Sequence, residues 1–275
     1  MEEITAEYAS EQLAPTVDLH TRVKVTVACK TDVGRTREIN QDKFEYYLPE
    51  DDAKLATRGL LFIVCDGMGG HAAGQVASEL ATKTFIDVYL QHPAQDPTQA
   101  MLAAVQAANR FVMDNARAYP ARKGMGTTLS AVLLIQDQAY IVQVGDSRIY
   151  RVRNGELLQL TMDHTVPNEL HRMGMIPEED IAKHPQHHML TRAVGIEGEI
   201  KPDIDVHDLK AGDIFMLCSD GITNHVPDEE VAAILTTNPP SGAAWKLVGN
   251  ALIGGGSDNA TAMVVRVDGL YPASE

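Results

Sequence analysis

The chain has 275 residues, 44% of them hydrophobic, so it can bury a sizeable core as one large domain or two small ones. Its 38 acidic and 23 basic residues give a formal net charge of -15, which disfavours nucleic acid and anionic membranes as partners. No apolar run approaches the length of a membrane span, and the N-terminus lacks the pattern of a signal peptide, so we expect a cytoplasmic protein.

The N-terminal half begins with an acidic, weakly patterned stretch, residues 1–20, which we expect to be a loose tail. Apolar alternation and apolar runs then predict strands, and longer helical patterns predict two helices. In chain order the elements are a strand at 22–30, a polar loop, a strand at 44–48, a charged loop at 49–58, a strand at 60–65, and helices at about 73–91 and 98–118.

The C-terminal half is rich in predicted strands, and Asn154-Gly155 is the strongest hairpin signal in the chain. An antiparallel meander is expected from strands at 129–136, 139–144, 147–152 and 157–160. The further elements are a mobile flap with one helix at 163–190, strands at 205–208 and 214–218, helices at about 228–237 and 241–253, and a strand at 260–267. Because no repeat or linker is evident, we predict one domain over 21–268 and a C-terminal tail at 269–275.

The three cysteines, Cys29, Cys65 and Cys218, are far apart in the sequence and lie in apolar runs. This placement predicts buried free thiols in a reducing compartment. It does not fit a disulfide framework or a zinc site.

The stretch from Leu60 to His71 is the most informative in the sequence. Its apolar run ends at Asp66, and Gly67, Gly69 and Gly70 follow before a helical pattern begins. A carboxylate at the end of a buried strand can present a metal ligand or a nucleophile. Alternatively, Asp66 only caps the helix that follows.

Three further aspartates share the position beside a strand end and a glycine or tight turn: Asp146, Asp220 and Asp258. Each alone is more simply explained as a turn or cap residue. If these strand ends converge, their oxygen ligands would suit Mg²⁺ or Mn²⁺ better than zinc. Arg37 lies in a nearby polar loop and presents a planar fork that suits phosphate, although its spacing alone favours an ordinary surface arginine.

Seven motifs together identify a family. They are R-x-x-N-Q-D at 37–42, F-I-V-C-D-G-M-G-G-H at 62–71, G-M-G-T-T at 124–128, V-G-D-S-R at 144–148, L-T-R-A-V-G at 190–195, C-S-D-G at 218–221 and S-D-N-A-T at 257–261. In this order, over residues 22–267, they closely resemble the bacterial metal-dependent Ser/Thr protein phosphatases of the PPM, or type 2C, family. The resemblance implies an α+β fold: a four-layer αββα sandwich of two antiparallel sheets flanked by helices, with a flap subdomain.

The resemblance also implies the roles of the metal ligands. Asp66 would bridge two Mn²⁺ or Mg²⁺ ions, with the Gly67 carbonyl on one of them. Asp220 and Asp258 would hold the second ion, and Asp146 with Asp220 matches a third, weaker position.

Other roles implied by the resemblance concern the surroundings of the ions. Arg37 would bind the phosphate. Asp42 would lie beside the metal centre, unless it only caps its loop. Ser219 and Asn259 are expected to orient the neighbouring aspartates.

The implied reaction is hydrolysis of phosphoserine or phosphothreonine by direct attack of a water that bridges the metals. The general acid stays open, because Met68 replaces the histidine of eukaryotic relatives. His71 is one candidate acid, but it can equally pack or cap at the helix start, and a metal-bound water is another candidate. The flap histidines, among them His164 and His188, are expected to form a polar substrate-selecting surface, with Met173 and Met175 anchoring the flap.

The expected partners are phosphorylated proteins and an opposing Ser/Thr kinase, with the enzyme acting as a monomer and without nucleic acid or membrane. A regulatory module that has lost catalysis is a rival, but it predicts damaged metal positions, and these are intact. A phosphodiesterase or nuclease is a second rival, which the acidic charge disfavours.

Overall fold

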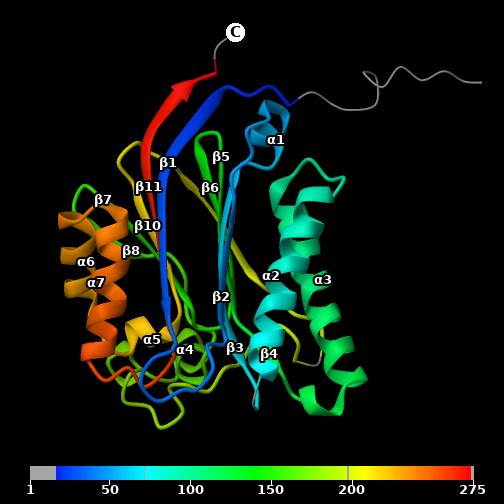
Figure 1. Ribbon diagram of the computed structural model, residues 1–275, viewed down its shortest axis with the longest axis vertical. Helices are drawn as coiled ribbons and strands as arrows, with labels where there is room; N and C mark the ends of the chain where they lie inside the picture. Colours follow the sequence, from blue (N-terminus) through cyan, green and yellow to red (C-terminus); the bar gives the residue numbers. More distant parts are fainter. Residues whose placement is uncertain (1–16, 71, 197, 274–275) are drawn as a thin grey trace, which may run out of the picture.

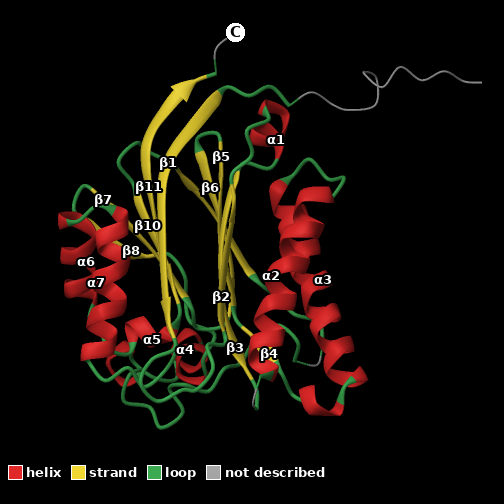
Figure 2. Ribbon diagram, viewed as in Figure 1, coloured by secondary structure: helices red, strands yellow, loops and turns green. Residues whose placement is uncertain are grey.

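The computed structural model describes residues 17–70, 72–196 and 198–273. Two antiparallel sheets pack face to face, and helices cover the outer face of each sheet, which gives four layers (Figure 1). Figure 2 shows the two strand layers in the middle and the helices outside. The αββα sandwich expected from the sequence is confirmed.

The first sheet has five strands. In spatial order they are β1 (Thr21–Asp32), β11 (Ala260–Pro272), β10 (Ile214–Cys218), β7 (Arg148–Arg153) and β8 (Glu156–Gln159). The second sheet has six strands: β2 (Asp42–Tyr47), β3 (Leu60–Met68), β5 (Leu129–Ile135), β6 (Gln138–Val144) and β9 (Asp203–Asp208) in spatial order, with β4 (Gly126–Thr127) paired to the end of β3.

Helices α2 (Ala73–Gln91) and α3 (Pro97–Ala118) cover the second sheet, and α6 (Asp228–Thr237) and α7 (Pro240–Ile253) cover the first (Figure 1). Helix α3 begins where it does because the Asp96 side chain accepts the N–H of Thr98 at 2.9 Å and Pro97 takes the first helical position. The short helices are α1 (Asp52–Thr57), η2 (Pro120–Arg122), α4 (Val166–Arg172), η3 (Glu178–Asp180) and α5 (Asp220–Thr223).

Strand β3 shows how the pleat divides the core into layers. Leu61, Ile63 and Cys65 point toward α2 and α3 and are fully buried there. Phe62 and Val64 point the other way, into the core between the two sheets. Because side chains alternate along a strand, Asp66 lies in line with Phe62 and Val64, at the end of the space between the sheets.

The predicted antiparallel meander is wrong. Strands β5 and β6 pair in the second sheet, whereas β7 and β8 pair in the first. The chain changes sheet at Gly145 and Asp146, where Gly145 has a positive φ of 101°. A Cβ at Gly145 would lie 2.6 Å from Thr128 Cγ2, so the crossover needs glycine.

Three other elements differ from the sequence predictions. The charged loop at 49–58 contains α1, which Asp51 caps by accepting the N–H of Lys54 at 2.9 Å. Strand β3 continues past Asp66 to Met68 because β4 pairs with its end. Strand β11 extends to Pro272 along β1, so much of the predicted tail at 269–275 is strand.

The remaining predictions concern the flap, the cysteines and the ends of the chain. The flap contains α4 and η3, and a β-bridge between Thr165 and Leu190 closes its base. All three cysteines are free; two are buried, and Cys29 is half-buried. None of the helices in the described ranges is long and apolar enough to span a membrane. Most of the predicted tail at 1–20 lies outside the described residues.

Candidate active site

The predicted site residues converge on one cavity at the end of the space between the sheets. The cavity has a volume of about 390 Å³. Its lining includes every predicted metal ligand and the predicted phosphate ligand: Arg37, Asp66, Gly67, Asp146, Asp220 and Asp258. The sequence thus predicted which residues would meet.

Asp42 and Asp66 lie directly opposite each other on β2 and β3. Asp42 Oδ2 accepts hydrogen bonds from Ser219 Oγ at 2.7 Å and Thr261 Oγ1 at 2.6 Å. Its Oδ1 is buried without a hydrogen-bond partner. Burial raises the pKa of Asp42 to about 6, opposed by these hydrogen bonds and reinforced by the charges of Asp220 and Asp258.

The backbone of Asp66 is fixed by the G-T-T segment. Its N–H donates to Thr128 Oγ1 at 2.8 Å, and its carbonyl accepts from Thr127 Oγ1 and from the Thr128 N–H, both at 2.8 Å. Burial raises the pKa of the Asp66 carboxyl well above its usual range, and the charge of Asp42 adds to the shift. Thr127 and Thr128 were not predicted as site residues, although their motif was noted.

Asp146 and Asp220 come from the crossover between the sheets and from the end of β10. Burial raises the pKa of Asp146 to about 7, and the charge of Asp220 adds to the shift. Burial also raises the pKa of Asp220, and the charge of Asp258 contributes. Asn224 donates to Asp220 Oδ2 at 3.1 Å, while Asp220 Oδ1 is buried without a hydrogen-bond partner. The cavity therefore concentrates negative charge that the described side chains leave partly uncompensated.

Arg37 lies at the edge of this cluster. Its Nη2 donates to Asp258 Oδ2 at 2.8 Å, and its side chain is 54% exposed. The hydrogen bond and the charge of Asp258 raise the pKa of Arg37, so the guanidinium stays charged. An exposed, charged fork beside the cavity is suitably placed to meet an incoming anion.

Ser219 and Asn259 hold the surrounding loops. Ser219 donates its hydroxyl to Asp42, whereas the predicted orienting role concerned its sequence neighbour Asp220. Asn259 differs from the prediction: its side-chain amide donates to the carbonyls of Val33 and Ile39, at 2.9 and 3.1 Å. It orients Asp258 only through its backbone N–H, which donates to Asp258 Oδ1 at 2.8 Å.

Close backbone packing explains two of the glycines. A Cβ at Gly67 would lie 2.1 Å from the Gly74 carbonyl oxygen, and one at Gly221 would lie 1.9 Å from the Asn259 carbonyl oxygen. Larger residues at these positions would push apart the segments that carry Asp66, Asp220 and Asp258.

The predicted histidines have three different outcomes. His71 lies outside the described residues. His188, predicted only as part of the flap surface, lines the active-site cavity. His164 is fully buried, so the prediction that it forms part of a polar flap surface is wrong. Met173 and Met175 are 64% and 67% exposed, so they do not anchor the flap as expected.

The donor set fits hard divalent cations. It consists of oxygens, among them the buried Asp220 Oδ1, which has no hydrogen-bond partner, and burial together with neighbouring carboxylates disfavours the charged forms. No group of three or more His, Cys, Asp or Glu side chains in the described ranges is arranged to hold an ion by itself. Such an open arrangement fits Mg²⁺-type sites, in which one or two carboxylates act together with water.

Comparison with known proteins defines the class of this fold and site. The sequence profile described as Protein phosphatase 2C matches residues 34–242. The serine/threonine phosphatase Stp of Listeria monocytogenes is 37% identical over 244 residues, which cover 87% of this chain and 94% of Stp.

Solved structures show the same similarity. The crystal structure of the Mycobacterium tuberculosis serine/threonine phosphatase PstP/Ppp has a TM-score of 0.78 at 35% identity and covers 89% of this chain and 99% of that one. A PstP catalytic domain in complex with two manganese ions has a TM-score of 0.74 at 35% identity, with coverage of 88% and 97%.

The chain belongs to the protein phosphatase 2C family, in its bacterial form. It is a protein serine/threonine phosphatase.

Proposed function

We propose that this phosphatase hydrolyses phosphoserine and phosphothreonine with two Mn²⁺ or Mg²⁺ ions in the 390 Å³ cavity, and with room for a third. Asp66 would bridge the two ions, with the Gly67 carbonyl on the first and with Asp220 and Asp258 on the second. Asp146 and Asp220 would hold the third ion. The observation that carries the proposal is the convergence of these carboxylates on one cavity, where the buried Asp220 Oδ1 has no hydrogen-bond partner.

The two manganese ions of the similar PstP catalytic domain support this assignment. When bound, the ions would make water a better nucleophile and neutralise charge on the phosphoryl oxygens. The oxygen of water forms a bond to phosphorus, the bond from phosphorus to the serine or threonine oxygen breaks, and no phosphorylated enzyme forms. Trapping a covalent phosphoryl-enzyme would contradict this direct route.

Side chains of this chain would position the substrate and the ligands. Arg37 would bind the non-bridging phosphoryl oxygens and hold the phosphate against the cluster. Asp42 accepts hydrogen bonds from Ser219 and Thr261 and would keep these two residues in place. Its unpartnered Oδ1 would accept a further hydrogen bond. The leaving oxygen needs a proton, and His71 or a water would supply it.

We also propose the cellular setting expected from the sequence. The enzyme would act as a monomer with one domain over residues 21–268, removing phosphate added to proteins by a Ser/Thr kinase. Sedimentation tests the oligomeric state, since a monomer has a mass of 29.9 kDa. Loss of the enzyme should raise the phosphothreonine content of the substrates of that kinase.

The decisive experiment measures phosphate release from matched phosphothreonine and phosphotyrosine peptides, with Mn²⁺ or with a chelator. We expect Mn²⁺-dependent release that is faster from phosphothreonine and absent in Asp66→Asn. The variant controls for a contaminating phosphatase. Bis(p-nitrophenyl) phosphate, a phosphodiester, is the comparison substrate for the phosphodiesterase alternative.

Two outcomes would contradict the proposal. No release with any divalent metal would favour a regulatory module that binds phosphoproteins. Faster turnover of the phosphodiester than of the phosphothreonine peptide would favour a phosphodiesterase.

A further inference from the structure

The crossover that carries Asp146 is held by hydrogen bonds from two sides. Gln143 Nε2 donates to the carbonyls of Gly145 and Ser147, at 3.0 and 2.6 Å. From the other side, His164 donates its backbone N–H to the Gly145 carbonyl at 2.8 Å and accepts the Gly145 N–H on Nδ1 at 3.1 Å. Both polar groups of the Gly145 backbone are therefore bonded to the same histidine.

These bonds act on Asp146 through the peptide plane. The Gly145 carbonyl and the Asp146 N–H belong to one planar peptide unit, so fixing that carbonyl fixes the plane that enters the Asp146 Cα. The Ser147 carbonyl, held by Gln143, restricts the chain on the other side of Asp146. The His164 ring holds the preceding peptide through the Gly145 N–H, so the ring and the backbone of His164 together fix the two peptide planes of Gly145 before the chain reaches Asp146.

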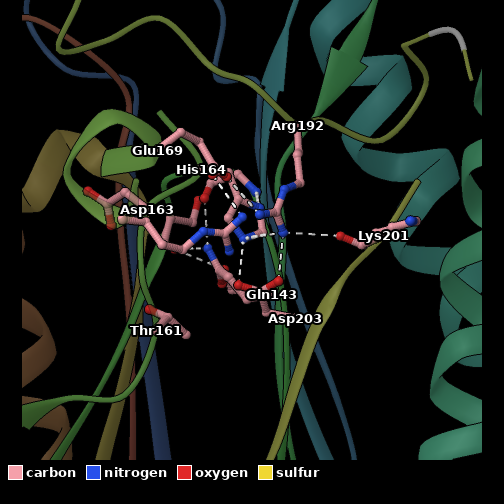
Figure 3. A network of polar contacts seen from close by, with 12 residues as sticks. Gln143, Thr161, Asp163, His164, Glu169, Arg192, Lys201 and Asp203 are labelled. Carbon is pink, nitrogen blue, oxygen red and sulfur yellow. Dashed lines mark hydrogen bonds and ion pairs between the residues drawn. The ribbon is translucent and has the colours of Figure 1, made fainter. Parts of the chain in front are cut away.

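His164 is itself held by a buried polar network (Figure 3). Its side chain is fully buried, and because Nδ1 accepts the Gly145 N–H, the ring hydrogen is on Nε2, which lies 3.1 Å from Asp203 Oδ2. Arg192 Nη1 lies 3.0 Å from the same ring nitrogen and donates to Asp203 Oδ1 at 2.6 Å. The ring orientation therefore depends on an ion pair behind it.

The network also reaches the flap. Arg192 Nη2 donates to Glu169 Oε1 on α4 at 2.7 Å, and Arg192 Nη1 reaches the Lys201 carbonyl at 3.2 Å. Asp146, at the other end, lines both the active-site cavity and a second cavity of about 290 Å³ beneath the flap, which it shares with Asp220 and His188. A continuous set of contacts thus connects α4 to the carboxylate between the two cavities.

We propose that His164 is a positioning residue for the third metal position, because its ring and its backbone N–H hold the two peptide groups of Gly145, the residue that precedes Asp146. The proposal rests on the proposed function, which places Asp146 and Asp220 at that ion. Removing a group that orients a metal ligand commonly weakens metal binding by about 10–100-fold. The effect should be largest for the ion on Asp146, since the hydrogen bonds to the backbone of Asp66 come from Thr127 and Thr128 and not from His164.

Two substitutions test the roles of the two ring nitrogens of His164 separately. In His164→Asn, the amide oxygen stands where Nδ1 stands and can still accept the Gly145 N–H. In His164→Gln, the longer side chain reaches toward Asp203 but leaves the Gly145 N–H without its acceptor. Both replace a fully buried imidazole by an amide, so each serves as the control for the other.

The measurement is Mn²⁺ binding to the full chain by titration calorimetry, with free Mn²⁺ followed by its electron paramagnetic resonance signal. We expect His164→Gln to raise the Kd of the weakest binding step about tenfold, with the tighter steps changed by less than about threefold. His164→Asn should change every step by less than about threefold. Circular dichroism confirms that both variants are folded at the temperature of the titration.

The outcomes distinguish this proposal from the proposed function. A wild type that binds no Mn²⁺ refutes both proposals. One that binds two ions with no third step refutes the third ion and the role of His164 but leaves the two-ion centre and the phosphatase reaction standing. Equal effects of the Asn and Gln variants on all steps would show a merely structural histidine. If His164→Gln does not fold, Asp203→Ala frees the ring on its far side and should raise the weakest Kd at least about threefold; an unchanged Kd overturns the proposal.

Discussion

The paired strands β7 and β10 place aspartates at both of their ends, and the two ends differ in how they compensate the charge. At the far end, Asp213 is fully buried, and its two oxygens accept from Arg153 Nε and Nη2, each at 2.7 Å. At the cavity end, burial and the charge of Asp220 raise the pKa of Asp146, and burial and the charge of Asp258 raise the pKa of Asp220. Arg148, which begins β7 there, is bonded instead to Asp163 at 2.8 Å.

The carboxylate at the far end has a structural role, whereas the carboxylates at the cavity end are available to bind a ligand. A buried carboxylate without a partner costs stability, and a fold normally pairs it, as Arg153 does for Asp213. The cavity end keeps its carboxylates close together and partly unpaired, which is expected where a cation from solution completes the structure. Substitutions at the two ends should therefore have opposite effects on stability and activity.

Asp66→Asn should have the largest effect at the cavity end. We expect phosphatase activity to fall about 1,000-fold or more, equivalent to about 4 kcal/mol, because the carboxylate proposed to bridge the ions is lost. In chelator, the same variant should be at least as stable as the wild type, since a neutral amide relieves repulsion from Asp42 and Asp220. Activity assays and denaturant unfolding in EDTA measure the two effects, and a less stable metal-free variant would contradict the unpaired state of the cluster.

Arg153→Met should show the reverse behaviour. It leaves Asp213 buried without its cation, so we expect a loss of about 3 kcal/mol in the free energy of unfolding. The turnover number of the folded protein should stay within about twofold, because Arg153 lies at the far end of β7 from the cavity. Unfolding curves and kcat on one preparation test this, and a large drop in kcat would show that the two ends are coupled.

Arg37→Ala tests whether the exposed guanidinium at the cavity end binds the substrate phosphate. If Arg37 serves the substrate phosphate, KM should rise about tenfold, or about 1.4 kcal/mol, with little loss of stability. Arg37→Lys keeps the charge but loses the planar fork and should recover only part of the affinity. Unchanged KM with lowered stability would instead make Arg37 a partner of Asp258 alone.

The metal-free protein should lose stability as the pH rises from 6.5 to 8. In the folded state the pKa of Asp146 is about 7 and that of Asp66 is raised, whereas both ionise near pH 4 when unfolded. The folded state then holds more protons in this window, so the free energy of unfolding falls as they leave, by on the order of 1 kcal/mol. Unfolded His164 loses its proton at about pH 6.5, which acts in the opposite direction, so the fall should be clearest in the upper part of this window.

Denaturant midpoints in EDTA at three pH values measure this fall. Asp146→Asn should flatten the profile, and saturating Mn²⁺ should remove the fall, because bound ions favour the ionised carboxylates. A rise in stability across the same window would show that the carboxylates are already compensated in the metal-free protein.

Lys210→Ala should have the smallest effect. Lys210 Nζ lies 3.3 Å from Asp208 Oδ2, but both side chains are largely exposed, so we expect no measurable change in the free energy of unfolding. It is therefore the matched control for Arg153→Met at the same end of the strands. A loss as large as that of Arg153→Met would mean that Lys210 is coupled to the buried Arg153–Asp213 pair through Asp208, which Arg153 Nη1 also contacts at 3.0 Å.

Much of the fold and of the candidate site can be predicted from patterns within single segments of the sequence. The apolar run from Leu60 to Cys65 predicts a buried strand that ends at Asp66, and the repeated strand, aspartate and glycine arrangement predicts the candidate ligands. These features are encoded within a few residues of each other, so they can be read directly from the sequence.

What could not be predicted depends on contacts between distant segments. Strands β6 and β7 look like two strands of one meander, and only sheet packing separates them at Gly145. Nothing local pairs His164 with Asp203, 39 residues later, so a buried histidine was mistaken for a surface residue. Asn259 was assigned to its neighbour in the sequence, but its amide holds the loop that carries Val33 and Ile39.

The pairing of β2 with β3 has a consequence for the assembly of the protein. Strand β2 is at the edge of its sheet, and Asp42 stands opposite Asp66 while Lys43 stands opposite Cys65. A slip of one residue would place Lys43 opposite Asp66 and turn Asp42 to the other face. In that misaligned chain the Lys43 ammonium would neutralise the carboxylates around Asp66, and the site would bind Mn²⁺ weakly. Because the metal binds the correctly aligned chain more tightly, divalent metal present during refolding should favour the correct alignment of β2 with β3.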